Sequence, residues 1–522
     1  MSGGQDGDME SGVRSLLEVN NLGFRMTPGM SVATSRVTRE WSALRAEYKE
    51  GDILTFAISS GAAYVDPDNS YITFDMEITT TGANVGNTYH FFWGSDTEGR
   101  QNALNLFRDM RYTHSSGYEV DRITRGFAPW KYIQNAYTKD REWHETVGSL
   151  MRGYQTSGRG TIWWGSDGSG GAWPRAFPEY TPGPTDADKV FAAANANFDA
   201  GVTIPGAKVT INNPTMRPFA KPDAIGTIVV RVSIPLSCIS GVWDTDQLSP
   251  SFLMAGSRLE LTLQSHQQVF QVRGGVGGLA PVRGNYSYLL RNPKIVLETI
   301  TFTDAVLRSI SMTSANVGLE IPFIAMHQTT APILNDDMSV QVNRALSRAN
   351  LIIARVYPNT AQDDSDRCCQ LDSVASYFVA PTAQGWQVKL GAEFMPSAPI
   401  NDPLALYHAT QTAFGNWKAD RRNTVRMIDF VGSGSMAPAA GVGISGFCPY
   451  ATLGCMGMTL EKSSTLAQSG SPISAARDLS IVFGGSELGF FTDPLWNRLS
   501  VDIFVPYVTL ATVYLDSVLT RS

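Results

Sequence analysis

Histidines are the first side chains to consider for catalysis or metal binding. The sequence contains six: His90, His114, His144, His266, His327 and His408. No two of them lie within one helical turn of each other, so their spacing excludes a zinc finger and the paired histidines of helical zinc peptidases. A site assembled from distant residues stays open, but single core or surface histidines are the simpler interpretation. We therefore predict no metal site and no catalytic residue.

Two glycine-rich segments match the glycine spacing of nucleotide-binding loops, but the residues that follow them do not fit such a loop. Residues 441–446 (GVGISG) precede Phe447, Cys448 and Pro449, where no helix can begin to hold a phosphate. Residues 275–280 (GVGGLA) are followed by Pro281 and a turn. No lysine directly follows a glycine, and no serine has glycines two residues before and two after it. We predict no cofactor.

Acidic residues and cysteines give equally weak signals. Asp363, Asp364 and Asp366 form a small cluster, but the twelve-residue calcium loop with its glycine and final glutamate is missing. A solvated turn is the simpler interpretation. The five cysteines are an odd number with no CxxC pair, which indicates buried small side chains made in a reducing compartment. They are Cys238, Cys368, Cys369, Cys448 and Cys455.

Three tryptophans, Trp163, Trp164 and Trp173, stand in an irregular region of about residues 155–223 that is rich in Gly, Pro, Asp and Thr. Loops of this length are usually functional, and we expect this one to project outward from the first domain. Exposed tryptophans on a β-sandwich also suggest an alternative, a carbohydrate-binding or carbohydrate-active protein. No spacing selects a catalytic pair among the 48 acids. The odd cysteine count and the absence of a visible export signal argue against this alternative.

The segments that would position these residues are mostly strands. Residues 52–59, 71–78, 227–234 and 258–264 alternate apolar and polar side chains, as antiparallel sandwiches do. The second half continues with residues 350–357, 478–483 and 498–505. We expect a turn at residues 66–69. We also expect Pro506 to break the hydrogen-bond ladder of its strand, which continues past a bulge or edge. No strand–helix–strand rhythm occurs, which disfavours a parallel α/β fold.

Two segments have helical spacing. Asp402 is placed to cap a helix of about residues 402–418, with Pro403 in its first turn. Val37, Trp41, Leu44 and Tyr48 also follow one helical face, although an extended segment stays open for so short a pattern.

Composition limits the class of protein. The chain has 522 residues, 43% of them hydrophobic and 17% charged, with 48 glycines and 27 prolines. That length suits two large domains, and so many glycines and prolines exclude long helical bundles. The formal net charge is −7, which makes a general nucleic-acid binder improbable. The longest apolar run, residues 503–515, is shorter than the ~20 residues of a membrane-spanning helix, so we expect a soluble protein.

The order of the strand segments carries a resemblance. Residues 51–78 (GDILTFAISSGAAYVDPDNSYITFDMEI) pass through Tyr64, Val65 and Asp66 into a strand. Residues 451–483 and 498–519 supply two further blocks of strands. In this order the chain, from about residue 35 to 522, resembles the double jelly-roll major capsid proteins of double-stranded DNA viruses. It is similar to members from algal and protist viruses, virophages and polinton-like elements more than to the longer adenovirus hexons.

The resemblance implies an all-β fold of two consecutive antiparallel eight-stranded jelly rolls, with a few short helices and long loops. We expect a flexible arm over residues 1–34, a first jelly roll over 35–308 and a second over 309–522. The implied function is that of a non-enzymatic major capsid protein, which assembles as pseudo-hexagonal homotrimers that tile an icosahedral shell. Its partners would be itself, neighbouring capsomers, and penton and minor capsid proteins. The implied location is the virion capsid, after synthesis in the host cytoplasm or nucleus.

One feature departs from many capsid proteins that touch their genome. Their arms are basic, whereas this arm carries Asp6, Asp8 and Glu10 before its first arginine. We therefore expect no direct sequence-specific binding to nucleic acid. The genome would be held by other proteins, or would lie behind an inner layer such as a membrane.

Overall fold

The computed structural model describes most of the chain in seventeen segments. They are residues 33–58, 64–80, 89–93, 101–157, 219–221, 226–244, 256–274, 286–333, 338–358, 385–400, 402–415, 425, 455–461, 470–474, 478–484, 499–514 and 518–521. Across these segments, no helix has the length and apolar character needed to cross a membrane.

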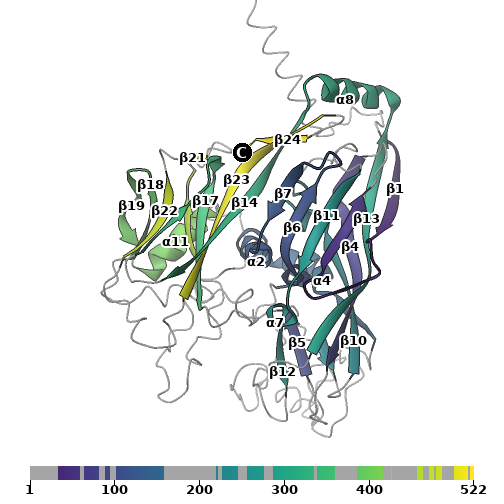
Figure 1. Ribbon diagram of the computed structural model, residues 1–522, viewed down its shortest axis with the longest axis horizontal. Helices are drawn as coiled ribbons and strands as arrows, with labels where there is room; N and C mark the ends of the chain where they lie inside the picture. The colour runs from purple at the N-terminus through teal and green to yellow at the C-terminus, as the bar shows by residue number, and fades with distance from the viewer. Residues whose placement is uncertain are drawn as a thin grey trace, which may run out of the picture.

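The first half of the chain forms two antiparallel sheets that face each other (Figure 1). One sheet has the order β1-β13-β4-β10-β8, with β2 paired to β13. Its strands are β1 (Ala33–Ser42), β2 (Glu47–Lys49), β4 (Tyr64–Thr80), β8 (Tyr154–Ser157), β10 (Gly226–Pro235) and β13 (Tyr286–Phe302). The other sheet has the order β3-β11-β6-β7. Its strands are β3 (Ile53–Ile58), β6 (Phe107–Thr113), β7 (Glu119–Ile123) and β11 (Ser257–Leu263).

The pairing of these strands defines the topology. In chain order, β1, β3, β4, β6, β7, β10, β11 and β13 take the conventional letters B to I. The first sheet then pairs B-I-D-G and the second pairs C-H-E-F, which is the arrangement of a jelly roll. The first half is therefore one jelly-roll barrel.

The second half has the same topology. The sheet β20-β17-β23-β16-β21, to which β14 and β24 add through β23, faces the sheet β15-β22-β18-β19. The B to I strands are β14 (Leu319–Ile333), β15 (Met338–Val342), β17 (Leu351–Pro358), β18 (Gly385–Leu390), β19 (Glu393–Ile400), β20 (Met456–Thr459), β22 (Leu479–Gly484) and β23 (Leu499–Val513). The additional strands are β16 (Leu346–Ala349), β21 (Ser471–Ile473) and β24 (Val518–Arg521). The predicted double jelly roll is confirmed.

Short helices and a small sheet connect the strands. In the first barrel the F strand, β7, is followed by α2, α3 and α4. In the second barrel the F strand, β19, is followed by α11, and α8 links the two barrels. The helices are η1 (Ala103–Leu106), α2 (Phe127–Thr138), α3 (Arg141–Glu145), α4 (Val147–Arg152), η2 (Leu236–Cys238), α7 (His266–Val269), α8 (Asp304–Asn316) and α11 (Pro403–Ala413). The small sheet consists of β5 (Tyr89–Trp93), β9 (Phe219–Lys221) and β12 (Phe270–Gly274).

Side-chain alternation places the core between the sheets of each barrel. On β11, Leu259, Leu261 and Leu263 are buried, whereas Arg258 faces outward. Leu54, Phe56 and Ile58 of β3 are buried in the same manner. Removing such apolar area from water is the main favourable contribution to folding. The strand patterns in the sequence therefore identified the core faces correctly.

The helical pattern at residues 37–48 was a wrong prediction. Residues 33–42 form β1, which pairs with β13 from Ala33↔Phe302 to Ser42↔Lys294, and residues 47–49 form β2. Pairing along a long neighbouring strand satisfies the backbone groups of β1 that point toward β13. That tertiary context outweighs a weak local helical preference.

One other local prediction needs correction. Residues 66–69 do not form a turn between two strands: β4 is continuous, and they lie in a bulge, because the pairing with β13 shifts between Val296↔Tyr71 and Glu298↔Asp66. The prediction at Pro506 holds on one side of its strand. The ladder is interrupted there between the pairs that β23 forms with β17 and with β16, whereas the pairing with β14 continues through Met326↔Pro506.

The expected helix near 402–418 is α11, whose observed bounds are Pro403–Ala413. The Asp402 carboxylate caps it by accepting a hydrogen bond of 2.8 Å from the Ala405 amide. The division of the chain at residues 308 and 309 falls inside α8. It stays a prediction, as does the arm, most of which lies outside the described residues.

Candidate functional site

The described histidines do not assemble into a catalytic or metal-binding group. His114 and His144 are buried, and His408 is exposed on α11. His266 pairs with Glu50, with Nδ1 and Oε2 2.5 Å apart. No cluster of three metal-ligating side chains occurs in the described residues. The histidines therefore give no reason to assign chemistry.

Several other sequence candidates lie outside the described residues. These are Trp163, Trp164 and Trp173, both glycine-rich segments, the Asp363–Asp366 cluster and Cys368, Cys369 and Cys448. Cys238 and Cys455 are described, and both are buried free thiols. Burial raises the pKa of Cys238 to about 11 and that of Cys455 to about 12. Both are therefore protonated and unreactive near neutral pH.

The described feature that unites distant parts of the chain is the junction between the two barrels. Helix α2, which follows the F strand of the first barrel, packs against the second barrel (Figure 1). The ring of Trp130 lies 6.1 Å from that of Phe504 on β23, centroid to centroid. Tyr137 stacks on Phe414 at the end of α11, with centroids 4.6 Å apart. Aromatic contacts of this kind bury large apolar areas and fix the mutual orientation of the two elements.

Two glycines allow the barrels to approach closely. A Cβ atom added to Gly241, just after η2, would overlap the carbonyl oxygen of Ile324 on β14. One added to Gly126, at the start of α2, would overlap the side-chain amide of Gln328. The lack of a side chain at Gly241 is thus a requirement of the junction, because a backbone carbonyl cannot swing aside.

A buried polar group lies on the first-barrel side of the junction. The Asp121 carboxylate on β7 accepts a hydrogen bond from the Ser240 hydroxyl. Burial raises the pKa of Asp121, although the Ser240 hydrogen bond and the charge of Lys131 oppose that shift. Burial also lowers the pKa of Lys131 on α2, against the opposing charge of Asp244. The charges of Asp121 and Lys131 therefore each partly offset the cost of burying the other.

A polar hollow of about 340 Å³ also lies between β7 and β14. Its lining includes Asp121, His327, Arg344 and Tyr507. The Arg344 guanidinium lies over the Tyr507 ring, 5.4 Å from its centroid. Burial and the nearby charge of Arg344 lower the pKa of His327 from 6.5 to about 4. His327 is therefore neutral at physiological pH.

The sheet of the second barrel that faces this junction contains a buried ion pair. On β17, Arg355 lies with Nη2 3.9 Å from Asp502 Oδ2 on β23, and its side chain is 1% exposed. The Thr330 hydroxyl on β14 donates to Asp502 Oδ1 at 2.6 Å. Asp502 and Phe504 are two residues apart on one strand, so they share the outer face of the sheet. The ion pair thus lies on the face that receives Trp130.

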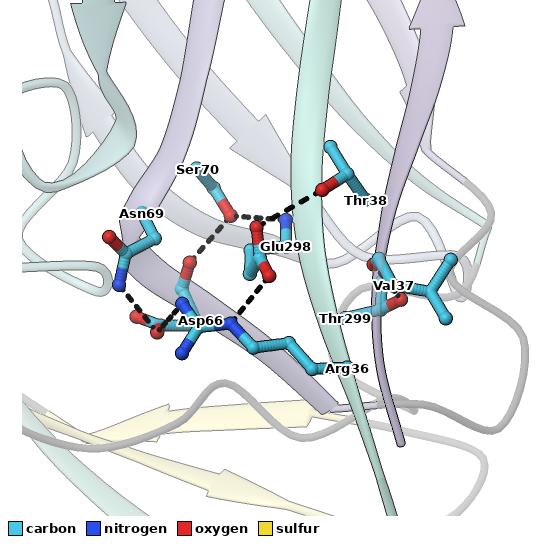
Figure 2. Close-up of polar contacts among 8 residues, drawn as sticks. All are labelled: Arg36, Val37, Thr38, Asp66, Asn69, Ser70, Glu298 and Thr299. Atoms are coloured by element: carbon cyan, nitrogen blue, oxygen red, sulfur yellow. Dashed lines mark hydrogen bonds and ion pairs between the residues drawn. The ribbon is translucent and has the colours of Figure 1, made fainter.

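The corresponding strands of the first barrel carry an exposed counterpart, shown in Figure 2. Arg36 Nε on β1 donates to Glu298 Oε1 on β13 at 2.5 Å, and Thr38 donates to Glu298 Oε2 at 3.2 Å. Arg36 also reaches Asp66 Oδ2, in the bulge of β4, at 3.3 Å. In the same bulge, Ser70 accepts from the Glu298 amide at 3.0 Å. Here the arginine is 52% exposed, because no described element covers this face.

Further ion pairs cover the outer surface of the β13-β4-β10 sheet. Arg231 forms a two-bond contact with Asp75, at 2.7 and 3.0 Å. Arg291 lies 2.7 Å from Glu77, and Lys294 lies 3.1 Å from Glu40. Exposed pairs contribute little to stability individually, but they keep a broad flat sheet soluble and discourage unspecific contacts.

A groove of about 620 Å³ interrupts this charged surface. Its lining includes Val296 and Pro293 from β13 and the exposed side chains of Leu44 and Tyr71. Lys294 and Arg45 line it as well, together with Glu40, Asp75 and Arg231. The described outer face of the first barrel thus has a depression lined by both apolar and charged side chains.

Sequence reasoning missed the junction residues. The segment 127–138 was not identified as a helix, although Pro129 stands in its first turn, where proline is favoured. Gly241 and Phe504 gave no signal at all, because their importance depends on a neighbour more than eighty residues away in the chain. The chemistry available to the described residues is that of packing and recognition.

Comparisons with known proteins agree with this architecture. No protein-family model and no curated protein sequence matches the chain. Among solved structures, the Faustovirus major capsid protein matches with a TM-score of 0.52 and 9% identity, over 94% of this chain and 92% of that one. A chain of the Sputnik virophage structure matches with a TM-score of 0.53 and 10% identity, over 95% of this chain and 90% of that one. The chain therefore shares the fold of these two proteins along nearly its whole length.

Proposed function

We propose that this protein is a major capsid protein that acts by assembly and performs no reaction. The observation that carries the proposal is the pair of jelly rolls in one chain, matched over more than nine-tenths of its length to the Faustovirus major capsid protein. The described residues support the proposal in a second way: aromatic contacts join the two barrels, and the described buried polar groups beside that junction do not converge on a reactive centre.

The assembly unit that we propose is a pseudo-hexagonal homotrimer. Each chain brings two barrels of equal topology, so three chains bring six similar blocks. The contact between the barrels of one chain is heterologous, since different surfaces meet in it. Heterologous contacts that repeat around an axis close into a ring. Many such trimers would tile an icosahedral shell, with contacts to neighbouring capsomers and to penton and minor capsid proteins.

The remaining parts of the proposal concern the position of the chain in the virion. We place it in the capsid, after synthesis in the host cytoplasm or nucleus. The segment around Trp163, Trp164 and Trp173 would face outward, and the N-terminal residues would contact neighbours at the base. The net charge of −7 supports a shell whose genome is held by other proteins or lies behind an inner layer. Tight, steeply salt-dependent DNA binding by the purified protein would contradict this last point.

The test is the mass and outline of the purified protein. Three copies of the 56.7-kDa chain give a particle of about 170 kDa in mass photometry. Negative-stain images should show a six-lobed outline. A particle that stays at the mass of one chain at every concentration would refute self-assembly through trimers.

A further inference from the structure

The polar hollow between β7 and β14 is lined by both barrels, which lie side by side at this point (Figure 1). Its volume is about 340 Å³. The first barrel contributes the charged side chains of Glu119, Asp121 and Arg122, and the second contributes His327 and Arg344. Pockets between two domains are frequent ligand sites. The charges of the lining decide which ligand this hollow suits.

The two carboxylates of the lining already have partners on the first barrel. Glu119 Oε2 accepts a hydrogen bond of 2.9 Å from Arg111 and lies 3.7 Å from Arg122 Nη1. The Asp121 carboxylate accepts a hydrogen bond from the Ser240 hydroxyl. No cluster of three metal-ligating side chains occurs in the described residues. The hollow is therefore poorly suited to a metal ion.

Arg344 carries a positive charge that is not matched in this way. Within the part of the chain that the structure describes, no carboxylate forms an ion pair with it. Its guanidinium lies over the Tyr507 ring, 5.4 Å from the ring centroid. Stacking of this kind uses the flat face of a guanidinium, so most of the N–H donors in its plane stay available. Arg344 thus supplies donors and an unmatched positive charge to the hollow.

His327 is affected by that charge. Burial and the charge of Arg344 lower the pKa of His327 from 6.5 to about 4, so its imidazole is neutral at physiological pH. A neutral imidazole still donates one N–H hydrogen bond. An anion beside Arg344 would oppose the positive charge that acts on His327 and would raise this pKa. Arg344 and His327 together therefore favour an anion as the ligand.

We propose that the hollow binds a small tetrahedral oxyanion, such as phosphate or sulfate, between Arg344 of the second barrel and Arg122 of the first. Guanidinium groups bind such anions through paired, charge-assisted hydrogen bonds. Arg122 is available for this contact, because its distance to Glu119 is long, at 3.7 Å. A ligand held from both sides would tie the two barrels together. This inference goes beyond assembly, since the site lies within one chain and needs no second copy.

Inorganic sulfate is the first probe, because it keeps its charge across the neutral and mildly acidic range. Calorimetric titration at constant ionic strength, balanced with chloride, should show one saturable site per chain. Arg344→Gln and Arg122→Gln should each weaken binding about tenfold or more, because each loses charge-assisted hydrogen bonds. Arg344→Lys should keep part of the affinity, since an ammonium group binds oxyanions as a point charge.

Arg348→Gln is the matched control. Arg348 is an exposed arginine on β16 and does not line the hollow, so its replacement removes the same charge and should leave the affinity unchanged. Sulfate also stabilises proteins in general, because it is excluded from their surface. A bound anion adds a saturable rise in unfolding temperature, which should occur in Arg348→Gln and be lost in Arg344→Gln. Urea unfolding verifies that each variant is folded.

The pH dependence of binding tests the position of the anion. Protonation of His327 adds a positive charge to the lining, and protonation of Asp121, whose pKa burial raises, removes a negative one. The other charged or titratable groups near these two are Glu119, Arg122, Lys131, Arg344 and Tyr507. Any of them that takes up a proton acts in the same direction. Sulfate should therefore bind more tightly as the pH falls from about 7 to 5. An affinity that stays constant would contradict a position beside His327 and Asp121.

A tetrahedral oxyanion is available in a cell as the free ion or as the end of a phosphate ester. Titrations with inorganic phosphate and with glycerol phosphate separate these sources: tighter binding of the ester assigns the site to esters, and tighter binding of phosphate assigns it to the free ion. Binding of none of the three anions, or equal binding by the unmodified and Arg344→Gln chains, would overturn the proposal. Either of these results leaves the proposed capsid function standing, because that function does not depend on the hollow.

Discussion

The ring of Tyr137 lies parallel to the ring of Phe414, with planes inclined by 13° and centroids 4.6 Å apart. One ring belongs to α2 of the first barrel and the other to the end of α11 in the second, so this stack joins two units whose strands lie far apart in sequence. Both residues are buried. Because this stack is buried, the junction between the two barrels is part of the folded core.

Tyr137→Ala should therefore destabilise the whole chain and loosen the two barrels from each other. We expect a loss of about 3–5 kcal/mol in the free energy of unfolding, the usual range for truncating a buried aromatic ring. Urea unfolding followed by tryptophan fluorescence measures it. Tyr118→Ala, at a more exposed tyrosine of the first barrel, is the control and should change stability by less than ~0.5 kcal/mol. Equal effects of the two substitutions would contradict the structural role of the stack.

Gly241→Ala should weaken the packing between the two barrels through a steric clash. The added methyl group would overlap the backbone carbonyl of Ile324, and we expect a cost of about 1–3 kcal/mol. Gly126→Ala is the matched comparison, because its new methyl group meets the movable end of the Gln328 side chain and should cost less. Unfolding free energies of the two variants, measured side by side, decide the point; the reverse order would refute it.

The ion pair of Arg355 and Asp502 should be sensitive to the loss of one partner. Arg355→Met leaves the Asp502 carboxylate buried without its cation, and we expect a loss of about 3–5 kcal/mol. Changing both residues, Arg355→Met with Asp502→Leu, should recover much of that loss, since no lone charge remains. The comparison at the surface is Arg36→Met: its partner Glu298 stays near solvent, so we expect a loss of less than ~1 kcal/mol. Similar losses for Arg355→Met and Arg36→Met would show that burial does not set the cost.

Stability should fall as the pH drops from about 6.5 to 4. The pKa of His327 lies near 4 in the folded chain, chiefly because of burial, and at 6.5 when unperturbed. Between these values the unfolded chain binds a proton that the folded chain does not, so acid favours unfolding. We expect His327 to account for about 1–2 kcal/mol of this change, allowing for its partial contact with solvent.

His327→Gln should flatten the pH dependence of unfolding between those two values, measured as the midpoint in urea. His408→Gln, at an exposed histidine of α11, is the control and should leave the curve unchanged. A His327→Gln curve as steep as that of the unmodified chain would exclude His327 as the responsible group.

Deletion of residues 1–30 tests the role proposed for the N-terminal arm. These residues precede β1, which begins at Ala33 and completes the sheet of the first barrel, so the deletion leaves every described strand intact. Trimers should form normally by mass photometry, whereas shells should assemble poorly under electron microscopy. Normal shell assembly by the shortened chain would refute the role of the arm.

The sequence alone determined the strand-rich character of the chain and the faces of its strands. Alternation in β3 and β11 identified buried residues correctly, because a half-buried strand needs one apolar face wherever it is placed. It also located α11, because an aspartate followed by proline is a local signal that needs no distant partner. The two halves share no recognisable sequence repeat, yet each pairs its strands as B-I-D-G and C-H-E-F.

Tertiary structure decided what depends on distant neighbours. Most of residues 37–48 became strands, in β1 and β2, because β13 offered a long pairing partner, against their own helical spacing. Gly241, Trp130 and Phe504 acquired their roles only when one barrel packed on the other. Arg36 and Arg355 are the same residue type beside a carboxylate, but one is solvated and the other buried. The physical reason is that a local pattern reports which face is apolar, whereas burial depends on what the rest of the chain places against it.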